Sequence, residues 1–116
     1  MRKSAFVALM LFSTLFLYAS TRADFKNGEE LHGVCRTPND PQAQAYCVGY
    51  VAAIADVLGT GKGTISGWRA CIPPKTTQGQ VATIAIQWLE KHPENRIFGA
   101  NNLVAQALAS AFPCSK

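Results

Sequence analysis

The sequence predicts an all-α fold, a compact bundle of about four helices held by two disulfides. Four segments repeat apolar residues with the helical spacing of three and four. No segment alternates with the strand period of two over more than a few residues. The chain also carries four cysteines, and an even number in a short exported chain indicates a disulfide framework.

The first two helices are predicted from their polar caps. Asn27 can cap a short helix, with Glu30 at the capping-box spacing. Asp40 and Pro41 provide the cap and the first residue of a longer helix, which Gly59 ends. The apolar residues expected to face the core are Leu31, Val34 and Cys35 in the first helix, and Cys47, Tyr50, Val51, Ile54 and Leu58 in the second.

The third and fourth helices have clear boundaries. Thr77 and Gln80 form a capping box at the start of the third, and His92 before Pro93 ends it. The fourth is expected over about residues 100–112, closed by Pro113. Their core faces are expected to be Val81, Ile84, Ala85, Trp88 and Leu89, and then Ala100, Leu103, Val104, Ala107, Leu108 and Ala111.

Residues 1–23 have the three parts of a secretory signal peptide. Arg2 and Lys3 are basic, residues 5–19 are almost wholly apolar, and Thr21 and Ala23 are small residues before the expected cleavage point. The apolar run is shorter than the roughly 20 residues of a membrane-spanning helix, which favours a cleaved signal over a retained anchor. We therefore expect export, and one helical domain over residues 24–116.

Removal of the expected signal peptide changes the net charge of the protein. The full chain has 11 Lys and Arg against 7 Asp and Glu, a net charge of +4. Three of these cations lie in residues 1–23, so the exported part is close to neutral. Its composition gives no reason to expect a nucleic acid or an anionic membrane as partner.

The helix layout predicts how the cysteines pair. Cys35 ends the first helix and Cys47 lies in the second turn of the next, so a short connection brings them together. Cys71 precedes the third helix and Cys114 follows the fourth, and these ends meet if the two helices are antiparallel neighbours. We expect the bridges Cys35–Cys47 and Cys71–Cys114. A zinc site is the alternative, but it favours closer cysteine pairs.

The residues provide no convincing catalytic or metal-binding motif. The glycine-rich stretch 59–64 fails the phosphate-loop pattern, which requires glycine where Asp56 stands and Ser or Thr where Gly63 stands. A flexible surface loop is expected there instead. His32 and His92 lack a second histidine at metal spacing, and His92 suits the dipole at a helix C-terminus. We expect no enzymatic activity, no cofactor and no metal.

Two features are candidate partner-binding surfaces. Residues 59–70 carry Lys62, Trp68 and Arg69 among four glycines, and Trp and Arg are enriched at binding hot spots. The alternative is that Trp68 tucks under the loop into the core. Ile86 lies off the main apolar stripe of its helix, which indicates either burial between two neighbours or an interface. Asp56 faces away from its own stripe, as a solvated charge or a partner contact.

The order of several short motifs resembles a known family. They are GEEL at 28–31 leading to Cys35, AYCVGY at 45–50 with Asp56, CIP at 71–73 with TQGQ at 77–80, WLEKHPE at 88–94, and LV, AL and AFPC at 103–104, 107–108 and 111–114. This pattern is similar to the Rap/Tai family of small periplasmic immunity proteins associated with type VI secretion. Residues 59–70 carry no family signature.

The resemblance implies a helical, disulfide-bonded, often dimeric periplasmic protein without enzymatic activity. Such proteins bind and block a toxic effector, typically a peptidoglycan amidase. Two other classes of function are weighed against this one. A small helical acid-stress chaperone would bind many unfolded clients through an exposed apolar surface. A small hydrolase would need a catalytic constellation that no set of residues supports.

Overall fold

Four α-helices and one short 3₁₀ helix account for most of the chain that the computed structural model describes, residues 25–59 and 61–115. The helices are α1 (Gly28–Cys35), α2 (Pro41–Leu58), α3 (Gln78–Lys91), η1 (Pro93–Asn95) and α4 (Ala100–Ala111). These residues contain no strand, only two isolated β-bridges, so the all-α prediction is confirmed. The signal peptide expected at residues 1–23 lies outside the described residues.

Side-chain caps start three of the helices where the sequence predicts them. The Asn27 carboxamide oxygen accepts a hydrogen bond from the Glu30 backbone N–H at 2.8 Å. The Asp40 carboxylate accepts two from the first turn of α2. Thr77 and Gln80 make the complete reciprocal capping box. Each cap satisfies backbone donors that a helix N-terminus otherwise leaves without partners.

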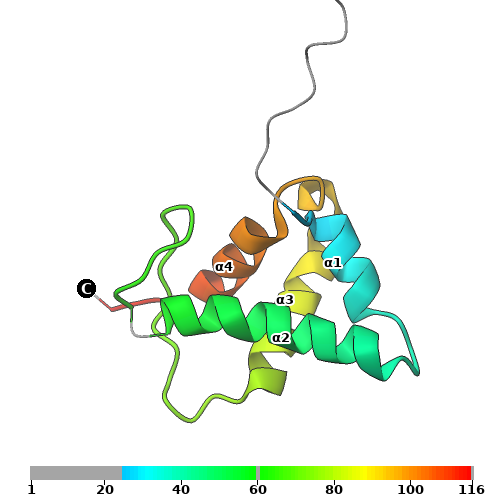
Figure 1. The fold of residues 1–116 in the computed structure, drawn as a ribbon. Coiled ribbons are helices and arrows are strands. Elements are labelled where there is room, and N and C mark those ends of the chain that lie inside the picture. Colours follow the sequence, from blue (N-terminus) through cyan, green and yellow to red (C-terminus); the bar gives the residue numbers. More distant parts are fainter. Residues whose placement is uncertain (1–24, 60, 116) are drawn as a thin grey trace, which may run out of the picture.

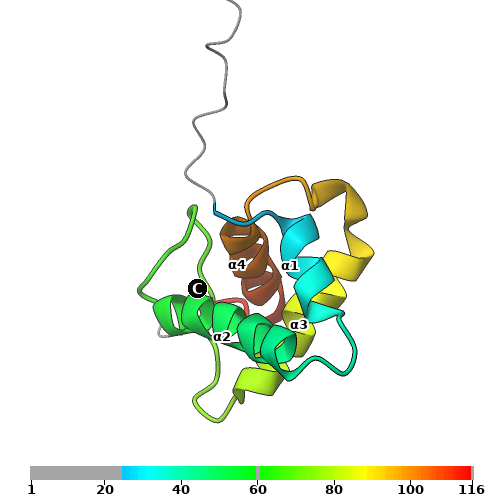
Figure 2. The ribbon, with the colours of Figure 1, turned by 45° about the vertical axis from the view of Figure 1, so that its right-hand side comes forward.

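The long helix α2 is the element around which the other three gather. It runs across the front of the molecule in Figure 1, and it contacts α1, α3 and α4. Figure 2 shows α3 and α4 side by side behind it. The largest fully buried side chains come from all four helices: Leu31, Val51, Leu58, Leu89, Leu103, Val104 and Leu108. In the described residues no helix combines the length and apolarity needed to cross a membrane.

A few positions depart from the predicted faces. Ala111 is exposed rather than buried, because it lies in the last turn of α4, where it lines an open groove with Ile84 and Trp88. His32 and Ala105 are buried although neither was expected in the core. The burial of Ala105 follows from the position of α4, which contacts α1, α2 and α3 and is covered on more than one face.

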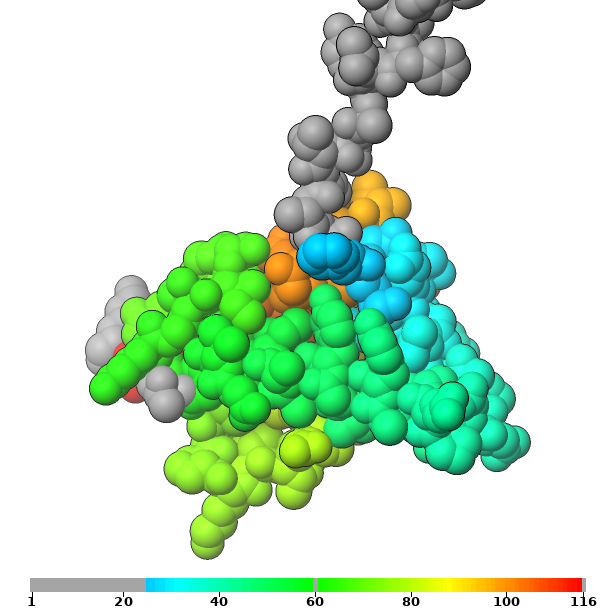
Figure 3. Space-filling model, in the orientation of Figure 1, coloured from blue at the N-terminus to red at the C-terminus, as the bar shows by residue number. Residues whose placement is uncertain are grey.

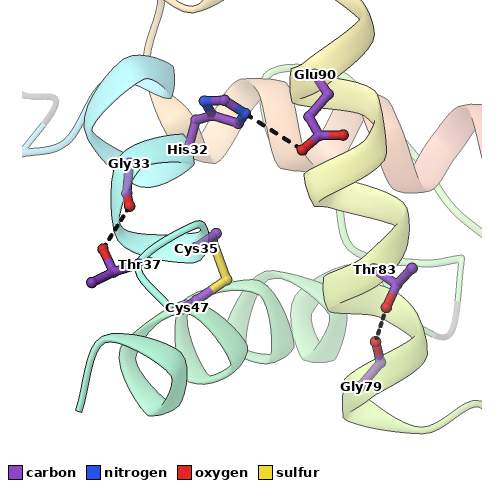
Figure 4. The surroundings of a disulfide bond; sticks show 8 residues. All are labelled: His32, Gly33, Cys35, Thr37, Cys47, Gly79, Thr83 and Glu90. Carbon is purple, nitrogen blue, oxygen red and sulfur yellow. Dashed lines mark hydrogen bonds and ion pairs between the residues drawn. A yellow bond between two sulfur atoms is a disulfide. The ribbon is translucent and has the colours of Figure 1, made fainter. Parts of the chain in front are cut away.

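Both predicted disulfides are present. Cys35–Cys47 joins the end of α1 to the second turn of α2, with the two Cα atoms 5.0 Å apart (Figure 4). Cys71–Cys114 joins the segment before α3 to the chain beyond α4, with the same Cα separation. No free cysteine remains among the described residues.

The start of α1 contacts the start of α4, and no sequence pattern predicted this contact. The backbone pairs at an isolated bridge between Asn27 and Gly99. A Cβ atom added at Gly28 would lie 2.5 Å from Leu103 Cδ1 and 2.9 Å from the Arg96 Cα, so only glycine fits there. This close approach fixes the short helix α1 against the rest of the bundle.

We predict that removing either bridge destabilises the fold, and that removing Cys71–Cys114 costs more. The chain-entropy model gives about 4 kcal/mol for its sequence separation of 43 and about 3 kcal/mol for the separation of 12 in Cys35–Cys47. Urea unfolding of the two Cys→Ser double variants measures both losses. A smaller loss for the Cys71/Cys114 variant would contradict the entropic explanation of this difference.

Candidate partner-binding surface

Residues 61–69 form a compact turn that we call the hairpin loop. The Ile65 and Trp68 backbones each donate a hydrogen bond to the other, at 3.2 and 2.9 Å. The two residues between them, Ser66 and Gly67, have φ values of 50° and 81°. Positive φ at both central positions is what a type I′ turn requires. The loop projects from the end of α2 and is the bright-green projection at the upper left of Figure 3.

The base of the hairpin loop is packed tightly against α2 and the Cys71–Cys114 disulfide. Gly61 has φ 73°, and a Cβ there would lie 2.8 Å from the Cys71 sulfur. A Cβ at Gly63 would lie 1.9 Å from the Val57 carbonyl oxygen, at the end of α2. The glycines therefore permit close packing.

Two further hydrogen bonds hold the other arm of the loop. The Trp68 indole N–H donates to the Asn102 side-chain oxygen on α4 at 2.9 Å. The Arg69 Nε donates to the Gly61 carbonyl at 3.0 Å. Together with its packed base, the loop is fixed to α2, to α4 and to the disulfide, which differs from the flexible loop that the glycines led us to expect.

The structure also decides between the two expectations for Trp68. Its side chain is 36 % exposed and lies outside the core, and Ile65 is the loop residue that packs against the core instead. Lys62 and Arg69 are exposed on the same loop. Lys62, Trp68 and Arg69, the three contact residues predicted within residues 59–70, therefore all lie on the hairpin loop.

Ile86, the other predicted contact residue, does not lie on the hairpin loop. It lies on α3, is partly buried, and is not among the hydrophobic residues that pack against the core. Asp56 is exposed on α2, as its position off the apolar stripe predicted.

An open groove of about 660 Å³ lies beside the start of α3. It is lined by Thr76, Thr77, Gly79, Gln80, Thr83, Ile84 and Phe112. None of these side chains is a nucleophile paired with a base, a charged group or a metal ligand. Among the described residues no three His, Cys, Asp or Glu side chains come close enough to hold a metal ion.

A charged seam lies between α1 and α3, centred on a buried histidine. Figure 4 shows His32 pointing from α1 toward Glu90, with Nε2 3.9 Å from the carboxylate. This nitrogen is buried and has no hydrogen-bond partner in the described residues. Burial lowers the pKa of His32, and the guanidinium groups of Arg96 and Arg36 lower it further. Their combined effect exceeds that of the carboxylates of Glu29 and Glu90, which raise it.

His92 lies at the C-terminal end of α3, where the sequence places it. It is the C-cap residue, its ring stacks on Trp88, and its Nδ1 lies 2.7 Å from the Trp88 carbonyl oxygen. Asn102 is the residue of this surface that sequence reasoning missed, because a hydrogen bond across 34 residues leaves no local pattern.

The fold is a small helical scaffold, crosslinked by two disulfides, that presents a braced loop. The family model of the Rap1a immunity proteins matches residues 27–114, and the chain belongs to that family. Membership indicates an immunity function against a secreted toxin. No curated protein matches the chain.

We predict that Gly63→Ala destabilises the protein by about 1–3 kcal/mol, because the added methyl group overlaps the Val57 carbonyl. Gly49→Ala in the middle of α2 is the matched control, since nothing lies within 4 Å of its added Cβ. That control is expected to stabilise by about 0.5–1 kcal/mol through helix propensity. Urea unfolding measures both, and a neutral Gly63→Ala would show that the loop is not packed as described.

We predict that His32 makes the protein less stable in acid. Its pKa is lowered in the folded state from 6.5, so the unfolded chain binds the proton more readily as the pH falls below that value. The stability contribution is complete above about pH 7 and declines at lower pH, by at most about 1.4 kcal/mol per pH unit for one proton.

The measurement is the free energy of unfolding of the wild type and of His32→Gln between pH 7.5 and pH 5.5. The difference between the two proteins is expected to shift in favour of the variant as the pH falls. A constant difference would contradict the assignment.

Proposed function

We propose that this protein is a periplasmic immunity protein that binds and blocks an effector delivered by type VI secretion, and that the effector is a peptidoglycan amidase. The family match over residues 27–114 carries the proposal. The architecture supports it, because an inhibitor requires a rigid scaffold and a presented surface rather than a catalytic group. Two disulfides and a braced loop reduce the conformational entropy that binding would otherwise cost.

The proposed contact surface is the hairpin loop with Lys62, Trp68 and Arg69. Its exposed Trp and Arg are residue types that dominate protein interfaces. Ile86 on α3 is proposed as a second, separate contact, either to the effector or between two copies in a homodimer. The protein acts without catalytic residues of its own, after export and cleavage of residues 1–23, as the domain over residues 24–116.

An acid-stress chaperone is the second candidate, and two observations favour it. Phe25 and Ile97 are 99 % and 70 % exposed, which gives apolar surface to clients. The buried His32 also makes acid loosening physically reasonable. The two candidates differ in stoichiometry, because an inhibitor has one tight partner and a chaperone has many weak ones.

The test uses a panel of purified type VI amidase effectors. We expect the oxidised protein to bind one of them tightly and to inhibit its hydrolysis of peptidoglycan at one equivalent. Suppression of the aggregation of several unrelated clients at pH 4, without inhibition of any amidase, would favour the chaperone. The absence of both activities would reject both candidates.

We predict that Trp68→Ala and Arg69→Ala each weaken effector binding by at least about tenfold, as hot-spot truncations do. Calorimetric titration measures the affinity, with thermal unfolding as the check that each variant folds. Glu94→Ala, an exposed residue of η1, is the control that should leave the affinity unchanged. Unchanged affinity in both loop variants would exclude the hairpin loop as the contact surface.

A further inference from the structure

The two disulfides differ in how deeply they are buried. Cys47 is only 2 % exposed, and Cys35 packs against the hydrophobic core. Cys71, by contrast, is exposed and Cys114 is partly exposed, and neither belongs to the residues that form the core or pack against it. A thiolate that attacks a disulfide must reach one of its sulfur atoms, so burial protects a bridge from exchange. The Cys71–Cys114 bridge is therefore the more accessible of the two.

The chain on either side of the Cys71–Cys114 bridge is also exposed. Pro73, Pro113 and Ser115 all lie at the surface. Figure 1 shows the red C-terminal segment at the left edge of the molecule, beside the end of α2. A reductant that approaches from this edge does not need to separate the helices.

The inner side of the same bridge contacts the base of the hairpin loop. A Cβ added at Gly61 would lie 2.8 Å from the Cys71 Sγ and 3.4 Å from the Cys114 Sγ. Gly61 is buried, its N–H donates to the Leu58 carbonyl at 2.8 Å, and its own carbonyl accepts the hydrogen bond from Arg69 Nε. One residue therefore connects both sulfur atoms to the end of α2 and to the other arm of the loop.

Cleavage of the bridge would change the space that its sulfur atoms need. Reduction replaces the covalent bond with two thiols, and heavy atoms that are not bonded require a separation of about 3.5–4.0 Å. Gly61 already occupies the inner side. The sulfur atoms can therefore separate only if the base of the loop or the C-terminal segment moves. Either movement removes the packing of Gly61 and weakens the hydrogen bond that Arg69 makes to it.

We propose that the Cys71–Cys114 bridge is a redox switch for the hairpin loop, which a dithiol opens while the Cys35–Cys47 bridge stays closed. A thiolate of the dithiol attacks one sulfur atom, the S–S bond breaks, and the displaced cysteine takes up a proton. The second thiol of the dithiol then displaces the other cysteine from the mixed disulfide. The protein gains two thiols, and the dithiol, which loses two electrons and two protons, becomes a disulfide.

The switch acts on the surface that we propose for effector binding, and its effect on binding rests on that proposed function. The oxidised protein presents Trp68 and Arg69 on a braced loop. Once the bridge is open, the loop must become ordered as it binds, and this loss of entropy lowers the affinity. The Cys35–Cys47 bridge still joins α1 to α2, so we expect the helical fold to persist.

The first experiment requires no effector. The oxidised protein is treated with dithiothreitol for increasing times, free thiols are alkylated, and each cysteine peptide is quantified by mass spectrometry. We expect Cys71 and Cys114 to become alkylated at least about tenfold faster than Cys35 and Cys47. When only the exposed bridge is open, amide hydrogen exchange in residues 61–69 should accelerate by at least about tenfold, while exchange in α1 and the helical circular dichroism stay unchanged.

Three results of this experiment would overturn the switch. The first is reduction of both bridges at the same rate, or of Cys35–Cys47 before the other. The second is unchanged exchange in residues 61–69 after Cys71–Cys114 opens. The third is loss of the helical signal at that point, which would show that the bridge holds the whole fold and not the loop.

Two double variants form a matched pair for the effect on binding, measured with the amidase effector that the wild type binds. Cys35→Ser/Cys47→Ser keeps only the exposed bridge, so it should bind as the wild type does and lose at least about tenfold in affinity on mild reduction. Cys71→Ser/Cys114→Ser keeps only the buried bridge, so its affinity should be low from the start and insensitive to the same treatment. Wild-type affinity in this second variant would contradict the proposal.

Failure of the switch and failure of the proposed function give different results. If no amidase in the panel binds, the proposed function is rejected, while the order of reduction and the exchange of the loop still decide the switch. If an amidase binds the oxidised protein and the protein without the Cys71–Cys114 bridge equally tightly, the proposed function stands and the switch is rejected.

Discussion

The disulfide between Cys71 and Cys114 closes the half of the molecule that contains the hairpin loop. It joins the segment before α3 to the residues beyond α4, so these two stretches of the chain cannot separate. Gly61 packs directly on its sulfur atoms, and the Cys71 N–H donates to the Phe112 carbonyl beside it. The base of the loop, the C-terminal end of the fold and the segment that leads to α3 therefore meet at one covalent bond. A reducing environment would loosen all three together.

The loop itself shows how a projecting segment is made rigid without a regular sheet. A two-residue turn sets its tip, Gly63 sets its distance from α2, and the Trp68–Asn102 hydrogen bond sets its angle to α4. Each restraint is individually modest. Together they order the backbone, which would leave little conformational entropy to be lost on binding a partner. Trp68 and Arg69, two of the proposed contact residues, also hold the loop in place.

The predictions from the sequence agree best with the structure where interactions between residues close in the chain determine the conformation. The caps at Asn27, Asp40 and Thr77 fix three helix starts, because the cap and the backbone donors it satisfies are two or three residues apart. Agreement is poorer for His32. Its position in α1 gives no hint of burial, which depends on α3 bringing Glu90 across the seam. The same holds for Gly28, whose lack of a side chain matters only because Leu103 and Arg96 approach it.

The sequence by itself determined the helices, their order and most of their apolar faces, because periodicity and caps are local. It also predicted the Cys35–Cys47 pair from a short connection, whereas the Cys71–Cys114 pair, 43 residues apart, was predicted only on the condition that the third and fourth helices are antiparallel neighbours. It also identified Lys62, Trp68 and Arg69 as candidate partner-binding residues. Only the tertiary structure decided that the Trp68 indole is hydrogen-bonded to Asn102 of α4 and lies outside the core, where Ile65 packs in its place. The tertiary structure also decided that the glycine-rich loop is braced against α2 and the disulfide. These outcomes depend on contacts across tens of residues, where packing and hydrogen-bond geometry choose among conformations that the local sequence allows equally.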